Sequence, residues 1–186
     1  MPKNRVYWIR ASIFPLMVCS GMVYSILSLF IADLGASKTQ IGMIFTVGSM
    51  GGAVAAPALG RVADKAGSKL ILLASMILFS ATFFLYSLAR NLFDMYVIQV
   101  LEGAAWSALG VSGVALVTDA APRDRKGEAI GVYNMTWYLG WIVGPGLGGF
   151  LSDTLGFRKT FLLCFALILI GIGLIIKVLK EHEPKS

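Results

Sequence analysis

Six long stretches without charged side chains dominate this sequence of 186 residues. Five of them contain no Asp, Glu, Lys or Arg and the sixth contains only Glu102; they are 17 to 24 residues long and cover 11–32, 39–60, 70–89, 95–118, 129–152 and 160–176. Each is close to the roughly 20 apolar residues that a helix needs to cross the hydrocarbon core of a bilayer. With 57% apolar and 14% charged residues, far from the composition of soluble domains, the chain is predicted to be an all-α membrane protein.

The basic residues between these stretches predict how the chain lies in the membrane. If the N-terminus is cytoplasmic, twelve of them fall on the cytoplasmic side: Lys3, Arg5, Arg10, Arg61, Lys65, Lys69, Arg123, Arg125, Lys126, Lys177, Lys180 and Lys185. Four fall on the opposite side: Lys38, Arg90, Arg158 and Lys159. Because basic residues accumulate in cytoplasmic segments, we expect a multi-pass protein of the cell membrane with both termini in the cytoplasm. The net charge of +6 then reflects topology, and nucleic acid is not an expected partner.

Residues 1–180 are predicted to form one six-helix transmembrane domain without a soluble part. The expected helices are 12–33, 39–59, 69–89, 94–117, 129–151 and 159–179, and 181–186 form a charged cytoplasmic tail or the start of a linker. The first apolar run is too long for the core of a signal peptide and is expected to be retained. Cys19 and Cys164 lie inside predicted spans, so we expect buried thiols rather than a disulfide.

A short motif occurs twice, 89 residues apart. GRVADKAGSK at 60–69 and GFLSDTLGFR at 149–158 both contain Gly-x3-Asp-x2-Gly followed by a basic residue. Each copy follows the second helix of a group of three, and the predicted topology places one copy inside and the other outside. This pattern indicates an inverted repeat of three plus three helices, which is a known plan of secondary transporters.

The same motifs carry a resemblance to a known family. GRVADKAGSK resembles the signature loop between helices 2 and 3 of the major facilitator superfamily; the matching residues are Gly60, Ala63, Asp64, Gly67 and Lys69. GVYNMTWYLGWIVGPGLGG resembles the helix-5 signature of the antiporter branch; all its fixed positions are present, namely Gly131, Gly140, Gly144, Pro145, Gly148 and Gly149. GFRKTF resembles the start of helix 6 in that family. The resemblance covers the whole chain but corresponds to the N-terminal half of a twelve-helix protein.

Gly140, Gly144 and Gly148 are spaced to form one stripe on a helix, where a missing Cβ lets another helix backbone approach closely. Pro145 removes a backbone hydrogen bond and permits a bend. The resemblance implies that this helix packs against the other half and controls leakage through the closed pathway. We therefore expect the glycine stripe of this chain to lack its partner; close packing within one bundle is the alternative.

Glu102 is the only charged residue well inside a predicted span, about 10 to 12 Å along its helix. A carboxylate there costs about 2.5 to 3.5 kcal/mol, so we expect it to face a polar cavity or to stay protonated. Gln99, Glu102 and Trp106 fall on one helical face. QVLEGAAWS resembles the helix-4 signature of the family, with Gln99 in place of an arginine associated there with proton coupling. The hypothesis is that Glu102 binds a cationic substrate group, carries the coupling proton, or both; a structural glutamate is the alternative.

Further polar and aromatic side chains on the first and fifth helices are expected to line the same cavity: Tyr24, Ser25, Ser28, Asn134, Trp137, Tyr138 and Trp141. Such rings suit amphipathic or cationic organic ligands. Asp64 is expected to engage the positive end of a facing helix dipole, and the resemblance implies that it latches two halves together. Asp119, Arg123 and Arg125 are expected to form ion pairs or to bind lipid headgroups.

The resemblance implies a secondary transporter that moves a small organic solute, drug-like or cationic, by alternating access coupled to a proton gradient. No metal, other cofactor or enzymatic activity is expected. Because the substrate site of such transporters lies between two halves, the expected partners are the lipid bilayer, the solute and a second six-helix half. That half would be the C-terminal half of a longer protein or a second copy in a homodimer.

Two other classes of protein stay open. Gly110-Val111-Ser112-Gly113 resembles the Gly-x-Ser-Gly of six-helix rhomboid proteases. A serine nucleophile needs a base within hydrogen-bond reach, however, and the only histidine, His182, lies in the tail. The other class is a truncated or assembly-partner membrane protein that does not itself transport.

Overall fold

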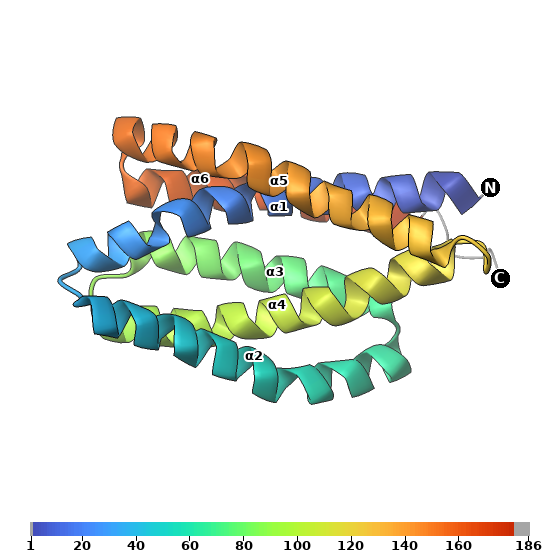
Figure 1. The fold of residues 1–186 in the computed structure, drawn as a ribbon, viewed down its shortest axis with the longest axis horizontal. Helices are drawn as coiled ribbons and strands as arrows, with labels where there is room; N and C mark the ends of the chain where they lie inside the picture. The colour runs from blue at the N-terminus through green and yellow to red at the C-terminus, as the bar shows by residue number, and fades with distance from the viewer. Residues whose placement is uncertain (1, 181–186) are drawn as a thin grey trace.

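The computed structural model describes residues 2–180, with side chains for residue 7 and residues 9–176. Throughout this range the backbone forms helices joined by short connections, with no strand, so the all-α prediction is confirmed (Figure 1). The helices are α1 (Pro2–Asp33), α2 (Lys38–Ala66), α3 (Ser68–Leu88), α4 (Leu92–Ala120), α5 (Lys126–Leu155) and α6 (Phe157–Lys180). The predicted tail, with His182, lies outside the described residues.

Capping side chains set the starts of two helices. At the start of α2, the Ser37 amide donates to Gln40 Oε1 over 2.9 Å and the Gln40 amide donates to Ser37 Oγ over 3.3 Å, which is a capping box. At the start of α4, the Asp94 amide donates to Asn91 Oδ1 over 3.0 Å. The predicted ranges lie within these helices except at Ala89, and most helices extend further than predicted. The reason is that charged residues end a hydrophobic stretch without ending the helix.

Five of the six helices are long and apolar enough to cross a membrane, judged on the described residues: α1 from Ile9, α2, α3, α4, and α6 as far as Ile176. The remaining helix, α5, has 30 residues but does not meet this hydropathy criterion. Glycine, tyrosine and tryptophan, which are frequent in α5, contribute little to hydropathy. The charge-free run 129–152 therefore predicted α5, whereas the hydropathy criterion alone does not select it.

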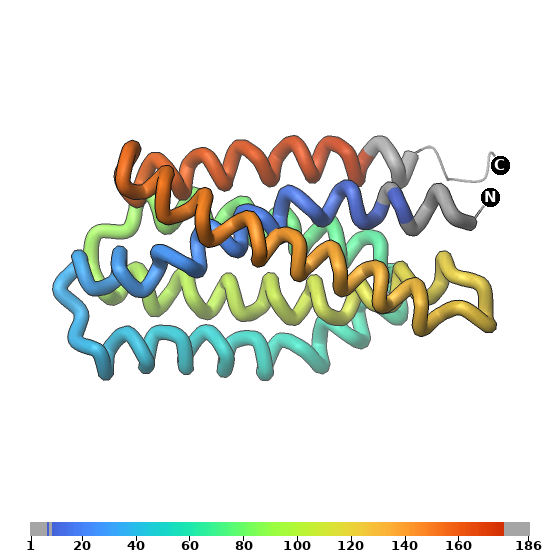
Figure 2. Tube along the Cα trace, turned by 45° about the horizontal axis from the view of Figure 1, so that its top comes forward, coloured from blue at the N-terminus to red at the C-terminus, as the bar shows by residue number. Residues whose placement is uncertain are grey.

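The helices form a bundle with an internal pseudo-two-fold relation. α1 packs most extensively on α5, and α2 on α4, while α3 packs on α4 and α6, and α6 packs on α1. Exchanging α1–α3 with α4–α6 reproduces each of these pairs. α5 crosses α1 obliquely, and α1 begins and α6 ends at the same end of the bundle (Figures 1 and 2).

The two copies of the sequence motif form the same turn. Gly67 alone separates α2 from α3 with φ 88° and ψ 143°, and Gly156 alone separates α5 from α6 with φ 83° and ψ 161°. In both turns the glycine amide donates to the carbonyl four residues earlier, at 2.9 Å. A positive φ favours glycine over residues with a Cβ. The inverted repeat predicted from an offset of 89 residues is thus confirmed in backbone geometry.

The glycine stripe of α5 packs against α1 of the same chain, which corrects the expectation that it would await an absent half. Gly140, Gly144 and Gly148 are buried. A Cβ at Gly140 would lie 2.5 Å from Met17 Cβ, and one at Gly144 would lie 2.5 Å from the Val18 carbonyl oxygen. Small residues at a crossing favour any close helix neighbour, and here that neighbour is within the six-helix unit.

An equivalent contact joins α2 to α4. A Cβ at Gly52 would lie 2.9 Å from the Gly103 carbonyl oxygen, and one at Gly51 would lie 2.9 Å from the Val100 carbonyl oxygen. The Ser107 hydroxyl donates to the Gly52 carbonyl over 2.6 Å. Close backbone contacts therefore hold α2 to α4 and α5 to α1.

Cys19 and Cys164 are buried free thiols, as predicted. Cys19 Sγ lies 3.7 Å from the Cys164 carbonyl oxygen at the contact of α1 with α6. Their environment is the apolar core, which runs through α1, α3, α4 and α6.

Candidate functional site: a pocket beside a buried carboxyl group

A pocket of about 330 Å³ lies between α1, α2 and α4. Its lining residues are Tyr24, Phe45, Gly48, Ser49, Gly52, Ala53, Gln99, Gly103, Trp106 and Ser107. No charged side chain is among them. The pocket offers aromatic ring faces, one amide and hydroxyl groups, which can bind an organic ligand by stacking and hydrogen bonding.

Glu102 lies directly behind this pocket, in a buried hydrogen-bond network between α3 and α4. The Tyr86 hydroxyl and the Gln99 amide both donate to Glu102 Oε2, the latter over 3.0 Å, and Gln99 Nε2 also donates to the Tyr86 hydroxyl over 2.8 Å. Glu102 is 1% exposed, Gln99 3% and Tyr86 0%. A buried carboxyl group is tolerated only when such donors replace water.

Glu102 itself does not line the pocket, which refines the expectation that it would face a polar cavity. Its neighbour Gln99 does line the pocket, and Gly48 of α2 makes room for the Gln99 side chain because a Cβ there would clash with it. The carboxyl group is thus linked to the pocket through Gln99, which both lines the pocket and donates to Glu102. No carboxylate lines the pocket.

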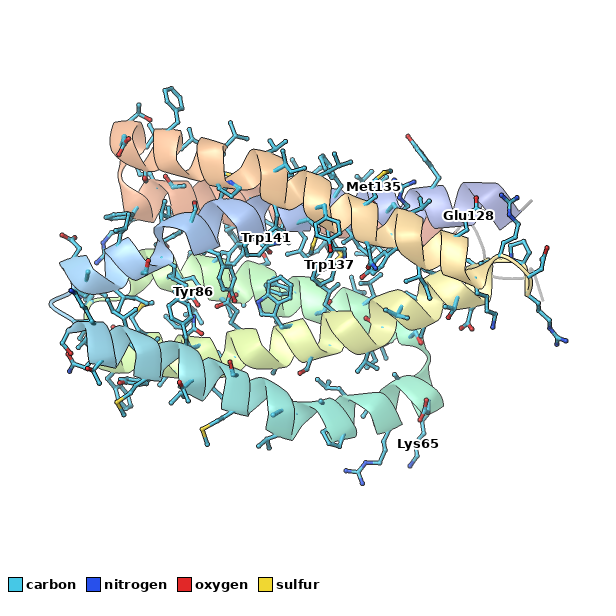
Figure 3. All side chains as sticks on the ribbon, in the orientation of Figure 1. Lys65, Tyr86, Glu128, Met135, Trp137 and Trp141 are labelled. Carbon is cyan, nitrogen blue, oxygen red and sulfur yellow. The ribbon has the colours of Figure 1, made fainter. Side chains whose placement is uncertain are left out.

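The structure brings four predicted aromatic residues together, of which Tyr24 and Trp106 line the pocket and Trp137 and Trp141 do not. The Trp106 indole N–H donates to the Tyr24 hydroxyl over 2.6 Å. Ring centroids are 5.8 Å apart for Tyr24 and Trp141, and 5.5 Å apart for Trp106 and Trp137. Trp137 and Trp141 extend from α5 toward Trp106 and Tyr24 (Figure 3), and Trp141 remains 40% exposed. One aromatic cluster thus joins α1, α4 and α5.

Other predicted cavity residues lie apart from this cluster. Asn134 and Tyr138 are exposed on α5, Tyr138 at 70%. Ser25 donates to the Met22 carbonyl over 2.8 Å and lies 3.5 Å from the Pro145 carbonyl, at the crossing of α1 and α5. Ser28 is half-buried on α1 and does not line the pocket.

The predicted motif residues lie mainly at helix ends and crossings. Asp64 is exposed near the end of α2, and Lys69 is half-buried in the first turn of α3. At Gly60, Gly131 and Gly149 a Cβ would meet nothing within 4 Å, so these three are not needed for packing inside this chain. Whether Asp64 contacts a second half stays a prediction.

The charged connection between α4 and α5 contains one ion pair. Arg125 pairs with Glu128 at 2.6 Å, and this contact raises the pKa of the Arg125 guanidinium. Of the three residues expected to pair or to bind headgroups, Arg125 thus forms an ion pair, with Glu128 of α5; headgroup binding stays a prediction. Asp119 and Arg123 are exposed.

The Gly-x-Ser-Gly sequence does not form a nucleophile site. Ser112 is fully buried, and its hydroxyl donates to the Ala108 carbonyl over 2.6 Å. That contact is the usual back-bonding of a serine inside a helix.

Two important residues were not predicted. Tyr86 approaches Glu102 from α3, and no local pattern in the sequence links them. Arg158 donates to the Ser87 and Ala89 carbonyls, 2.6 Å each, and its guanidinium lies 5.6 Å from the Phe30 ring centroid. It thereby satisfies carbonyls at the end of α3. The place of Arg158 in the repeated motif was a signal that could have singled it out. The motif did not predict which groups it contacts.

Comparison with known proteins connects this architecture to a family. A sequence profile described as Major Facilitator Superfamily matches residues 11–186. The Quinolone resistance protein NorA of Staphylococcus aureus (strain MRSA252) is 26% identical over 184 residues, which are 99% of this chain and 47% of that protein. The Uncharacterized MFS-type transporter MJ1560 of Methanocaldococcus jannaschii is 25% identical over 162 residues, 87% and 42% of the two lengths. The chain spans about half the length of the curated relatives it matches.

Solved structures share the fold at low sequence identity. The human organic anion transporter MFSD10 (TETRAN) aligns with a TM-score of 0.74 at 14% identity, over 96% of this chain and 47% of that one. The proton:xylose symporter XylE bound to 6-bromo-6-deoxy-D-glucose aligns with a TM-score of 0.69 at 16% identity, over 95% and 45%. In both cases one half of the larger protein corresponds to this six-helix bundle.

Proposed function

Because the chain belongs to the Major Facilitator Superfamily, we propose that it is one six-helix half of a secondary transporter that moves a small organic solute by alternating access. The observation that carries this proposal is the pocket between α1, α2 and α4 with a buried carboxyl group behind its wall. A transport site needs a ligand pocket and, for coupling to ions, a titratable group inside the membrane. No enzymatic activity is part of the proposal.

The pocket favours an aromatic, drug-like solute. Tyr24, Phe45 and Trp106 supply ring faces, and Gln99 with two serines supplies hydrogen bonds. A cationic solute would be held by cation–π contact with Trp106 rather than by an ion pair, because no carboxylate lines the pocket. Efflux of such solutes agrees with the name of the relative NorA, a quinolone resistance protein.

Coupling to protons would depend on Glu102. It is the single carboxyl group in the interior of the described helices, and Gln99 stands where related transporters carry the arginine associated with proton coupling. Proton binding would therefore be assigned to the carboxyl group and its hydrogen-bond partners. The proton gradient would be the only energy source, without a metal or organic cofactor.

Completion of the transport pathway would require a second six-helix half, covalently continuous or a second copy. α2 and α5 both present large apolar side chains at their surface, including Met50 at 61%, Val54 at 80%, Tyr138 at 70% and Ile142 at 73% exposure. A second half would cover part of these faces and would place Asp64 near a facing helix end. The protein would lie in the cell membrane with both termini in the cytoplasm.

The test is transport by the purified chain in liposomes with an imposed pH gradient, using the permanently charged aromatic cation ethidium as the probe. If two copies of the chain complete the pathway, ethidium is expected to move against its concentration gradient, and a protonophore or Glu102→Gln should abolish this movement. If the second half is the remainder of a longer protein, the purified chain is expected to be an inactive monomer, and the same assay is then made on the full-length protein. Glu128→Gln, in the exposed Arg125–Glu128 pair, is the matched control and should transport normally. Ethidium flux that ignores the pH gradient in the unmodified protein would contradict proton coupling. Static light scattering of the same sample, against a chain mass of 20.0 kDa, identifies the transporting species.

A further inference from the structure

The side chains that line the pocket use most of their hydrogen-bond donors on partners inside the protein. The Ser107 and Ser49 hydroxyls donate to backbone carbonyls of α2, over 2.6 and 3.1 Å. The Trp106 indole N–H donates to the Tyr24 hydroxyl over 2.6 Å. Among these groups the Tyr24 hydroxyl hydrogen is the exception, since the described residues offer it no hydrogen-bonded acceptor. The oxygens of all three hydroxyl groups can still accept a hydrogen bond.

Both N–H groups of the Gln99 amide are also used, in the network around Glu102. Gln99 Nε2 donates to Glu102 Oε2 over 3.0 Å and to the Tyr86 hydroxyl over 2.8 Å. The Tyr86 hydroxyl donates its own hydrogen to Glu102, and a carboxylate oxygen only accepts. Gln99 therefore faces two acceptors, which hold its nitrogen toward the network and its oxygen away from it.

Two carbonyl groups at the pocket lack their usual donors. Gln99 lines the pocket, and its Oε1 lies beside Gly48, another lining residue, where a Cβ would collide with that oxygen. Both hydrogen bonds of the Gln99 side chain are made by its nitrogen, and no described residue donates one to the oxygen. Ala53 also lines the pocket, and its carbonyl loses the usual helical donor because residue 57 is a proline without an N–H.

We infer that the pocket selects organic ammonium ions by their N–H groups, with Gln99 Oε1 as the main acceptor. Its free hydrogen-bonding capacity consists almost entirely of acceptors, and an N–H that carries positive charge is the strongest donor for them. The rings of Phe45, Tyr24 and Trp106 would hold the apolar part of the ion by stacking and cation–π contact. This inference deepens the proposed function and rests on it for the role of the pocket as the solute site. Ethidium meets the requirement through its aromatic amino groups.

Two cations of equal charge test this inference: phenethylammonium, and its N,N,N-trimethyl derivative, in which methyl groups replace every N–H. Their affinities are measured by isothermal titration of the protein in lipid nanodiscs, with the heats of empty nanodiscs subtracted. Phenethylammonium is expected to bind about tenfold more tightly, the size of one hydrogen bond from a charged donor. Aromatic contacts alone would give the opposite order, because methyl groups add apolar surface and lower the cost of leaving water.

Equal affinities, or tighter binding of the trimethyl derivative, would overturn the inference and leave the proposed function in place. Binding of neither cation would overturn the inference as well, and the ethidium assay then decides separately whether the proposed function survives.

Gln99→Met tests the assigned acceptor, because methionine keeps the length of the side chain but lacks the amide. The ratio of the two dissociation constants should fall below about threefold. An altered charge on Glu102 would act equally on both cations, so it cancels in this ratio. Asn134→Leu removes an amide from an exposed side chain of α5 outside the pocket and should keep the full ratio. An unchanged ratio in Gln99→Met would overturn the inference; if circular dichroism shows this variant unfolded, the two cations on the unmodified protein still decide.

Discussion

The hydroxyl of Tyr86 and the amide of Gln99 make it possible for Glu102 to be buried. Each donates to the same oxygen, so the carboxyl group keeps hydrogen bonds without contacting water. Helical spacing predicted that Gln99, Glu102 and Trp106 share a face, because that relation is local. Tyr86 could not be predicted, since it comes from another helix and aromatic residues are common in membrane spans.

Replacement of Tyr86 by phenylalanine tests this network. Tyr86→Phe removes one donor to Glu102 and one acceptor for Gln99, and is expected to lower the free energy of unfolding by about 1 kcal/mol, as for single hydrogen bonds in membrane proteins. Thermal unfolding in detergent, followed by circular dichroism, measures the change. Tyr138→Phe should be neutral, and equal stability of the two variants would show that the network contributes nothing.

At the scale of helices, the close crossings of α1 with α5 and of α2 with α4 determine the shape of the bundle. The spacing of Gly140, Gly144 and Gly148 predicted a contact stripe, but the partner was assigned wrongly. A surface of glycines carries no chemical group that distinguishes one helix neighbour from another, so only the tertiary structure identifies α1. By contrast, the turns at Gly67 and Gly156 could be predicted because the motif repeats in sequence.

A pair of glycine substitutions separates this contact from general helix propensity. Gly144→Ala would place a Cβ 2.8 Å from Gly21 Cα, which forces two backbones apart and should cost about 1 to 3 kcal/mol. Gly146→Ala lies on the same helix, where a Cβ meets nothing within 4 Å, and is expected to be neutral or slightly stabilising. Thermal unfolding in the same detergent compares them. Similar melting temperatures for both variants would contradict the packing role of Gly144.

At the scale of the whole molecule, charge distribution and length of apolar runs were enough to predict six helices and their order. The contacts of α3 with α4 and of α6 with α1 are equivalent under the inverted repeat. Once one of them is known, the repeat therefore predicts the other. The pocket could not be predicted in the same way. On α2 it is formed by Phe45, Ser49, Ala53 and two glycines, whose local sequence carries no sign of ligand binding.

The predicted topology can be tested by cysteine labelling in intact cells with a membrane-impermeant maleimide. Lys38→Cys, at the start of α2, should react from outside, whereas Asp124→Cys, between α4 and α5, should react only in inverted vesicles. The native thiols, Cys19 and Cys164, are both 0% exposed and should give no background. Labelling of both positions from the same side would contradict the topology, because the two connections lie at opposite ends of the bundle.

The matching turns at Gly67 and Gly156 also have a consequence for the origin of this protein. A unit that crosses the bilayer an odd number of times ends on the side opposite to its start. Tandem duplication of three helices therefore inverts the second copy automatically, with no separate event to turn it over. The two turns differ in charge: the first carries Arg61, Lys65 and Lys69, and the second carries Arg158 and Lys159. The two turns thus share a backbone geometry while their cations differ, and Arg158 of the second turn binds the carbonyls of Ser87 and Ala89 at the end of α3.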